Sequence, residues 1–380
     1  PEFRSRCQEN KGPVAYMITP QEKDLLPALV KWNPDYFIGS RLDVKVHRCQ
    51  GHRMFDLVHT SILDLAKSLR QHSTTLGQFV QRIQEQRQQS ASGTFIRNNA
   101  NLHPNSVVET ELLAGTDLYL RHNFEDRPYF QELMQDLGQL EQFLPISADQ
   151  VRTIGLWISS NATTKKDNNN DALSSPAFLS SQTHYDRDGD HNMNFQIQGT
   201  KLFTLYAPDN GQAHLYPLPL ARLSHLALVD PHNVADVHQF PRLQKAQPNV
   251  IELQAGEILF IPAFWWHDVR HVGDFNVNIT AWYPPESSSC RPSPRKLWTS
   301  FGSRWSSGTP QQPQATWHDY KDTLVAWHHV GKLVIVVLIM VLLEVMDKVK
   351  QLLGKTVPWF NEDTTLEYAR HQRRPSGKEL

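Results

Sequence analysis

The sequence predicts a mainly β protein, an antiparallel sandwich or barrel, with helical segments before and after it. From residue 118 onward, short apolar runs alternate with Gly, Pro, Asn and Asp, as in antiparallel strands joined by turns. Helical spacing of apolar residues precedes this region, and a long apolar segment follows it. The expected strands are Thr153 to Ile158, Met193 to Ile197, Lys201 to Tyr206, Val250 to Leu253, Ile258 to Ile261 and Val277 to Tyr283.

Residues 1–117 are expected to form an α/β flank. The alternation of apolar and polar residues in Leu42 to Val46 predicts a strand, whereas Phe55 to Leu69 and Leu76 to Ile83 have helical spacing. Gln84 to Asn105 is rich in Gln, Ser and Asn, so we expect a loop there.

Two polar stretches interrupt the β domain, which we place at residues 118–285. Asn161 to Ser175 contains three consecutive asparagines, and Leu218 to Pro248 is long and rich in His and Pro. Both are predicted to be loops, and long loops often cover a binding site. Residues 286–316 are dense in Ser, Pro, Gln and Arg and predict a linker that ends the β domain.

Residues 317–380 are predicted to form a helical region. Leu333 to Leu343 is a run of eleven apolar residues, about half of the roughly 20 needed to cross a bilayer, so a membrane-spanning helix is disfavoured. The apolar face continues beyond this run, which is typical of a helix buried in a subunit interface. We expect a homodimer formed through this helix; packing on its own domain and membrane contact are the less favoured alternatives.

Charge and cysteine content restrict the partners and the compartment. The net charge of −1 gives no bulk attraction to nucleic acid, so no DNA partner is expected, although a local basic patch could bind RNA. The three cysteines, Cys7, Cys49 and Cys290, have neither disulfide nor zinc-site spacing. With no signal peptide recognised, a reducing compartment is expected, the cytoplasm or the nucleus.

His184, Asp186 and His267 carry the predicted chemistry. Residues two apart in a strand point to the same face, so the side chains of His184 and Asp186 can converge on one ion. His267, from a distant strand, would complete the two-histidine, one-carboxylate set that suits Fe(II) and leaves coordination positions open. In a chain with 18 histidines such a pair alone is more often structural. The hypothesis therefore depends on the residues around it.

Lys201 is the first of these supporting residues. Asn194 to Tyr206 predicts a strand, a Gly-centred turn and a second strand that opens with Lys201. Such a lysine either ends a strand in solvent or, if buried, needs an anionic partner. We interpret it as the clamp for a dicarboxylic acid whose other end chelates the metal. Trp265 and Trp266 are interpreted as core residues that fix the backbone before His267.

Taken together, these residues resemble the JmjC and related cupin-type 2-oxoglutarate oxygenases, especially the subgroup with the asparaginyl hydroxylase of hypoxia-inducible factor. The resemblance covers Leu118 to Pro285 and implies a double-stranded β-helix (jelly-roll) with Fe(II) as cofactor and 2-oxoglutarate and O₂ as co-substrates. The matching motifs are His184-x-Asp186, Asn192 to Gln198, Gly199-Thr200-Lys201, Tyr216-Pro217, Gly256-Glu257, Ile261-Pro262, Trp265-Trp266-His267 and Trp282-Tyr283.

The resemblance also implies which residues contact 2-oxoglutarate. Besides Lys201, the candidates are Tyr119, Ser181, Asn192 and Thr280, of which Ser181 replaces a threonine and Thr280 an asparagine of the subgroup.

Two departures concern the metal and the substrate. The loop after His184 is two residues longer than in the subgroup and contains a second histidine, His191; we retain His184 as the ligand. Asn194 stands where an aromatic residue lines the family's pocket, so substrate preference does not transfer.

The implied activity is hydroxylation of a protein side chain with release of succinate and CO₂. A second hypothesis is hydroxylation of a modified tRNA base, since a member of the family does this. Histone demethylation is less favoured because no chromatin-reading module accompanies the β domain. A third hypothesis is an inactive cupin-fold interaction protein.

Overall fold

The protein is seen here in a computed structural model that describes most of the β domain and parts of both flanks. The described ranges are residues 12–49, 71–92, 117–123, 131–146, 148–159, 181–187, 189–218, 223–285 and 327–339, with single positions between and after them. The predicted insert Asn161 to Ser175 and the linker 286–316 lie outside the described residues, as does most of the predicted helix Phe55 to Leu69.

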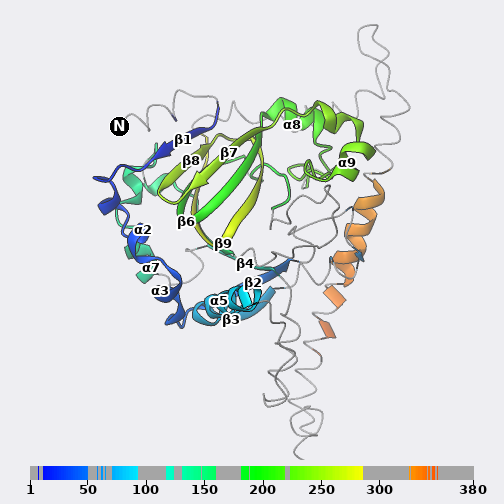
Figure 1. Cartoon of the computed structure of the whole chain (residues 1–380). Helices are drawn as coiled ribbons and strands as arrows, with labels where there is room; N and C mark the ends of the chain where they lie inside the picture. The colour runs from blue at the N-terminus through cyan, green and yellow to red at the C-terminus, as the bar shows by residue number, and fades with distance from the viewer. Residues whose placement is uncertain are drawn as a thin grey trace, which may run out of the picture.

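Within the described ranges, one antiparallel sheet of nine strands curves around the centre of the domain (Figure 1). Its order is β1-β8-β6-β9-β5-β4-β2-β3, and β7 pairs with β6. This confirms the predicted mainly β, jelly-roll fold. The strands are β1 (Val14–Met17), β2 (Asp43–Cys49), β3 (Gln71–Thr75), β4 (Asp117–Asn123), β5 (Thr153–Ser159), β6 (His191–Tyr206), β7 (Asn249–Gln254), β8 (Glu257–Ile261) and β9 (Trp266–Tyr283).

Strand β6 corrects the prediction of two strands joined by a turn at Gly199. It is one continuous strand of 16 residues, and it pairs along its length with β9, which has 18 residues and includes the predicted strand Val277 to Tyr283. Gly199 adopts a φ of 75° inside the strand. A glycine there marks a β-bulge rather than a turn.

The bulge changes which residues of β6 and β9 face inward. Between the pairs Gln198–Val277 and Thr200–Val272, β6 advances by two residues and β9 by five. Side chains alternate along a strand, so unequal advance switches the alternation. Both Asn192 before the bulge and Lys201 after it therefore line the same cavity.

The helices cover the sheet and correct two predicted loops. Helix α5 continues to Ser92, because the Gln, Arg and Glu residues after Ile83 are good helix formers. The predicted loop Leu218 to Pro248 contains two short helices, α9 and η6. The helical elements are η1 (Lys23–Leu25), α2 (Ala28–Lys31), α3 (Pro34–Ile38), α5 (Leu76–Ser92), α7 (Gln131–Asp136), η4 (Leu140–Gln142), η5 (Ala148–Gln150), α8 (Pro208–His214), α9 (Val234–Gln239) and η6 (Pro241–Lys245).

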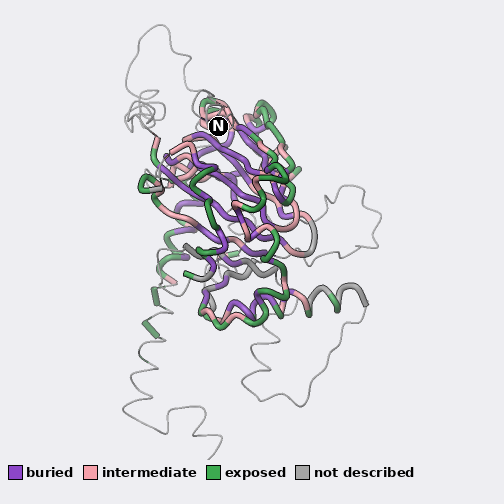
Figure 2. Tube along the Cα trace, turned by 90° about the vertical axis from the view of Figure 1, so that its left-hand side faces the viewer, coloured by how far each residue is buried: buried purple, intermediate pink, exposed green. Residues whose placement is uncertain are grey.

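The C-terminal helix, described over residues 327–339, packs one face on its own domain. Val330, Leu333 and Val336 are buried in a cluster with Tyr206, Leu215 and other residues. The opposite face is apolar and exposed, and it includes Val334, Leu338, Val341 and Leu342. Figure 2 shows the buried interior of the jelly-roll and its exposed surface. In the described part of the chain, no helix has both the length and the apolar character needed to span a membrane.

We predict that Gly199→Ala destabilises the fold by about 1–3 kcal/mol, because alanine is strained at the positive φ of this position. A steric clash should add to this loss. An added Cβ would lie 2.4 Å from the carbonyl oxygen of Phe275. Gly256→Ala is the matched control, since Gly256 has a φ of 88° and open space around its Cβ position. The free energy of unfolding, from chemical denaturation, should fall more for Gly199→Ala; equal losses would contradict the bulge interpretation.

Candidate metal centre and co-substrate cavity

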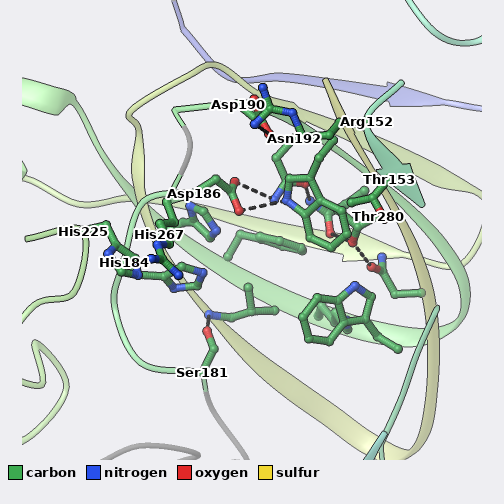
Figure 3. Close-up of a pocket in the computed structure, with 18 of the residues that line it drawn as sticks. Arg152, Thr153, Ser181, His184, Asp186, Asp190, Asn192, His225, His267 and Thr280 are labelled. Carbon is green, nitrogen blue, oxygen red and sulfur yellow. Dashed lines mark hydrogen bonds and ion pairs between the residues drawn. The ribbon is translucent and has the colours of Figure 1, made fainter. Parts of the chain in front are cut away.

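Two backbone hydrogen bonds join His184 to His267. The N–H of His184 donates to the carbonyl of His267 (2.9 Å), and the N–H of His267 donates to the carbonyl of His184 (2.6 Å). The residues are therefore directly opposed, with ring centroids 4.4 Å apart. One ligand atom from each of His184, Asp186 and His267 lies within 4.8 Å of the others, and Figure 3 shows these side chains gathered at one end of the cavity.

Backbone carbonyls orient both imidazoles. Nδ1 of His184 lies 2.6 Å from the carbonyl oxygen of Gln182, and Nδ1 of His267 lies 3.1 Å from that of Trp265. A carbonyl can only accept, so each Nδ1 carries the proton and each Nε2 has its lone pair available for a metal. Burial, followed by the nearby His267, lowers the pKa of His184 well below its usual value, which keeps its ring neutral.

The carboxylate of Asp186 is held by two donors. Nε1 of Trp282 donates to Oδ1 (2.8 Å), and Nδ2 of Asn192 donates to Oδ2 (3.0 Å; Figure 3). Oδ1 of Asn192 in turn accepts from Nδ2 of Asn194 (2.7 Å). The Thr280 hydroxyl donates to Oδ1 of Asn194 (3.1 Å), so a chain of hydrogen bonds runs from Asp186 into the sheet.

This chain continues through buried amides between β6 and β9. Nδ2 of Asn278 donates to Oε1 of Gln196 (3.1 Å), and Nε2 of Gln196 donates to Oδ1 of Asn276 (3.1 Å). All three side chains are buried. A buried polar network whose members satisfy one another is rigid, so it fixes the strands that carry Asp186's partners.

His184, Asp186 and His267 line a cavity of about 470 Å³, within the size range of small-molecule sites. Of the residues predicted to contact 2-oxoglutarate, Lys201, Ser181, Asn192 and Thr280 line it. Oγ of Ser181 also accepts a hydrogen bond from the N–H of Val269. For Tyr119 the structure describes only the backbone, which pairs with Ser159 in the register of β4 and β5.

Lys201 is a buried lysine for which the described residues provide no counter-charge. It is 4% exposed, and burial lowers its pKa to about 7. Within the described residues, no hydrogen bond or ion pair to its ammonium group is found. Because a buried ammonium without a counter-charge is costly, the cavity is suited to an anion at this end.

His191 is a structural residue rather than a metal ligand. Its Nδ1 accepts a hydrogen bond from the N–H of Ala263 (3.0 Å), and its ring packs against those of Phe260 and Tyr283. Burial lowers its pKa to about 4, in agreement with a neutral acceptor. Of the two tryptophans interpreted as core, Trp266 is buried, whereas Trp265 is half-buried.

The cavity contains residues that the sequence reasoning missed. His267, Val269 and His271 occupy alternate positions of β9 and all line the cavity. The period-two rule applied from His267 would have identified His271. Arg152 and Asp190 form an ion pair of 3.1 Å at the wall, and no spacing in the sequence linked them.

Comparisons with known proteins identify a family and several relatives. Residues 17–289 match a family model described as Cupin-like domain. HSPB1-associated protein 1 from Homo sapiens is 34% identical over 93 residues, 24% of this chain and 19% of that protein. Lysine-specific demethylase JMJ30 from Arabidopsis thaliana is 32% identical over 114 residues, 30% of this chain and 25% of that protein. The chain thus aligns with a quarter or less of the length of these relatives.

A longer alignment extends over 274 residues of tRNA wybutosine-synthesizing protein 5 from Homo sapiens. It covers 70% of each chain at 24% identity.

We predict that Asn192→Ala weakens Mn(II) binding about 10- to 100-fold, because a metal-binding carboxylate that loses its orienting donor is poorly placed. Affinity should be measured by isothermal titration calorimetry. Asn249→Ala, an exposed asparagine at the start of β7, is the matched control and should bind as the wild type does. If Asn192→Ala keeps wild-type affinity, the orienting role is refuted.

Proposed function

This chain belongs to the cupin-like domain family, and on that basis we propose that it is an Fe(II)- and 2-oxoglutarate-dependent dioxygenase that hydroxylates a protein side chain. The observation that carries the proposal is the convergence of His184, Asp186 and His267 in the cavity that also buries Lys201. A metal-binding triad and a separate buried cation match a ligand with a chelating end and a second carboxylate.

The residues present fit Fe(II). The Nε2 atoms of His184 and His267 and one carboxylate oxygen of Asp186 would hold it, since both Nδ1 atoms are engaged by carbonyls. When bound, the metal would supply the activation of O₂. Three protein ligands leave the remaining positions for co-substrates.

Lys201 would hold the far carboxylate of 2-oxoglutarate as a charge-assisted partner. Ser181, Asn192, Thr280 and Tyr119 are the further proposed contacts. The balanced reaction consumes the C–H bond of the substrate, O₂ and 2-oxoglutarate and yields the alcohol, succinate and CO₂. The protein's part is to position both co-substrates and to exclude water from the cavity.

A protein substrate is favoured over tRNA on electrostatic grounds. The net charge of −1 provides no general attraction to a polyphosphate backbone. Hydroxylation of a tRNA base is the second candidate, favoured by the long alignment with a tRNA wybutosine-synthesizing protein and by Arg152 and Arg187 at the cavity. Two further alternatives are lysine demethylation, after the name of the demethylase JMJ30, and a non-catalytic protein-binding role, after the name of HSPB1-associated protein 1. We place the activity in the cytoplasm or the nucleus.

We further propose that the C-terminal helix forms a homodimer. Its face opposite Val330, Leu333 and Val336 is apolar, and Leu338 on it is 63% exposed. A second copy of the same helix would cover this surface.

Purified protein supplied with Fe(II) and ascorbate is predicted to convert 2-oxoglutarate to succinate, measured by mass spectrometry with peptide pools and RNA pools. His184→Ala or Asp186→Ala should abolish Fe(II) binding and turnover because each removes a ligand. Lys201→Ala should mainly raise the KM for 2-oxoglutarate and leave Fe(II) binding intact.

The RNA and peptide arms decide between the two substrate classes. Absence of turnover with every pool, together with absence of metal-dependent stabilisation by N-oxalylglycine, would leave the interaction-protein alternative. If circular dichroism shows that all three variants lose their folded structure, His184, Asp186 and Lys201 have a structural role instead.

Leu338→Glu is predicted to convert a dimer to a monomer of 43.7 kDa, because burying the introduced carboxylate in an apolar interface is costly. Size-exclusion chromatography with light scattering measures the mass. Val250→Glu places the same charge at an exposed valine on β7 and should leave the mass unchanged. A wild-type protein that is already monomeric would refute the interface.

A further inference from the structure

Two arginines form the rim of the cavity. Among the described residues that line it, Arg152 and Arg187 are exposed, and all the others are buried or half-buried. A residue that lines a cavity and is also exposed lies where the cavity meets the surface. A substrate that enters from solvent therefore meets two guanidinium groups before it reaches the metal-binding triad.

The two arginines differ in what they contact within the protein. Arg152 forms an ion pair of 3.1 Å with Asp190, whose side chain is buried (Figure 3). Arg187 directly follows Asp186, the proposed metal ligand, and no ion pair or hydrogen bond of its side chain is found within the described residues. Its guanidinium has five N–H donors in a planar fork, so it can bind an anionic group outside the chain.

The cavity keeps an excess of positive charge when its proposed ligands are bound. Apart from the histidines, the charged residues of its described lining are three cations, Arg152, Arg187 and Lys201, and two carboxylates, Asp186 and Asp190. The charges of a divalent metal ion and of doubly negative 2-oxoglutarate cancel each other. The remaining positive charge attracts an acidic substrate segment and repels a basic one.

The aromatic residues of the lining favour a peptide over RNA as the source of this negative charge. Proteins that bind single-stranded RNA follow the phosphates with many cations and stack bases on accessible aromatic rings. Here Trp157 is half-buried, and Phe203 and Trp282 are buried. A single carboxylate, which a guanidinium binds through two parallel hydrogen bonds, fits the rim better.

We propose that Arg187 pairs with a carboxylate of the protein substrate, so that the enzyme selects acidic segments. This inference rests on the proposed function and names its substrate class. Because Arg187 is the next residue after Asp186, the aspartate or glutamate that it binds would lie within a few positions of the hydroxylated residue. Arg152, already paired with Asp190, would add a weaker attraction.

Fluorescence anisotropy tests this with two labelled peptide pools of equal length, randomised at the centre and flanked either by glutamates or by lysines. The protein is loaded with Mn(II) and N-oxalylglycine so that no turnover occurs. The wild type should bind the glutamate pool about 10-fold more tightly than the lysine pool. Arg187→Gln should weaken binding of the glutamate pool about 3- to 10-fold, Arg187→Lys should keep most of it, and Arg187→Glu should reverse the preference.

Arg41→Glu makes the same charge change at an exposed arginine outside the cavity lining, and it should bind both pools as the wild type does. Arg187→Gln should keep the wild-type affinity for Mn(II), measured by calorimetry. A parallel loss of Mn(II) affinity would show a structural role for Arg187 and overturn the inference.

Three other results would overturn the inference while leaving the proposed function intact. The wild type binds the two pools equally, it binds neither pool, or it binds a labelled oligouridylate RNA more tightly than the glutamate pool. The proposed function itself fails if the wild type binds Mn(II) but not 2-oxoglutarate.

Discussion

The pair of backbone hydrogen bonds between His184 and His267 is the constraint on which the site depends. It ties the segment before β6 to the first residues of β9, so two histidines far apart in sequence are directly opposed. Asp186 follows two residues later and is fixed by Asn192 and Trp282. Residues from the start of β6 and from both ends of β9 thus support one triad, although His184 and Asp186 themselves lie in the segment before β6, outside the named strands.

The bulge at Gly199 connects this triad to the other end of the cavity. A regular pairing of β6 with β9 would keep only one alternating set of residues facing inward. The unequal advance of the two strands lets Asn192 and Lys201 face the same space. The site therefore combines a rigid metal end with an anion-binding end, as a dicarboxylic co-substrate requires.

The sequence predicted the fold class and the convergence of His184, Asp186 and His267. The strand predicted to carry His184 and Asp186 is absent from the described residues, where an isolated bridge from His184 to His267 brings the side chains together instead. At Gly199 a turn was predicted where the structure has a bulge, because a turn and a bulge differ only in the long-range pairing of the strands. His271 was missed, although the period-two alternation from His267 along β9 places it at the same cavity. The C-terminal helix was predicted from its apolar run, yet only the structure shows that one face packs on its own domain.

We propose that one ferrous ion binds His184, Asp186 and His267 and that a keto acid chelates this ion. Anaerobic titration of the protein with Fe(II), followed by 2-oxoglutarate, tests this most directly through the visible charge-transfer absorption of an iron–keto-acid chelate. We expect this absorption only when both are present, and we expect it to saturate at one Fe(II) per chain. Two results would contradict this proposal. Either the protein binds no Fe(II), or it binds Fe(II) but the absorption does not appear when 2-oxoglutarate is added.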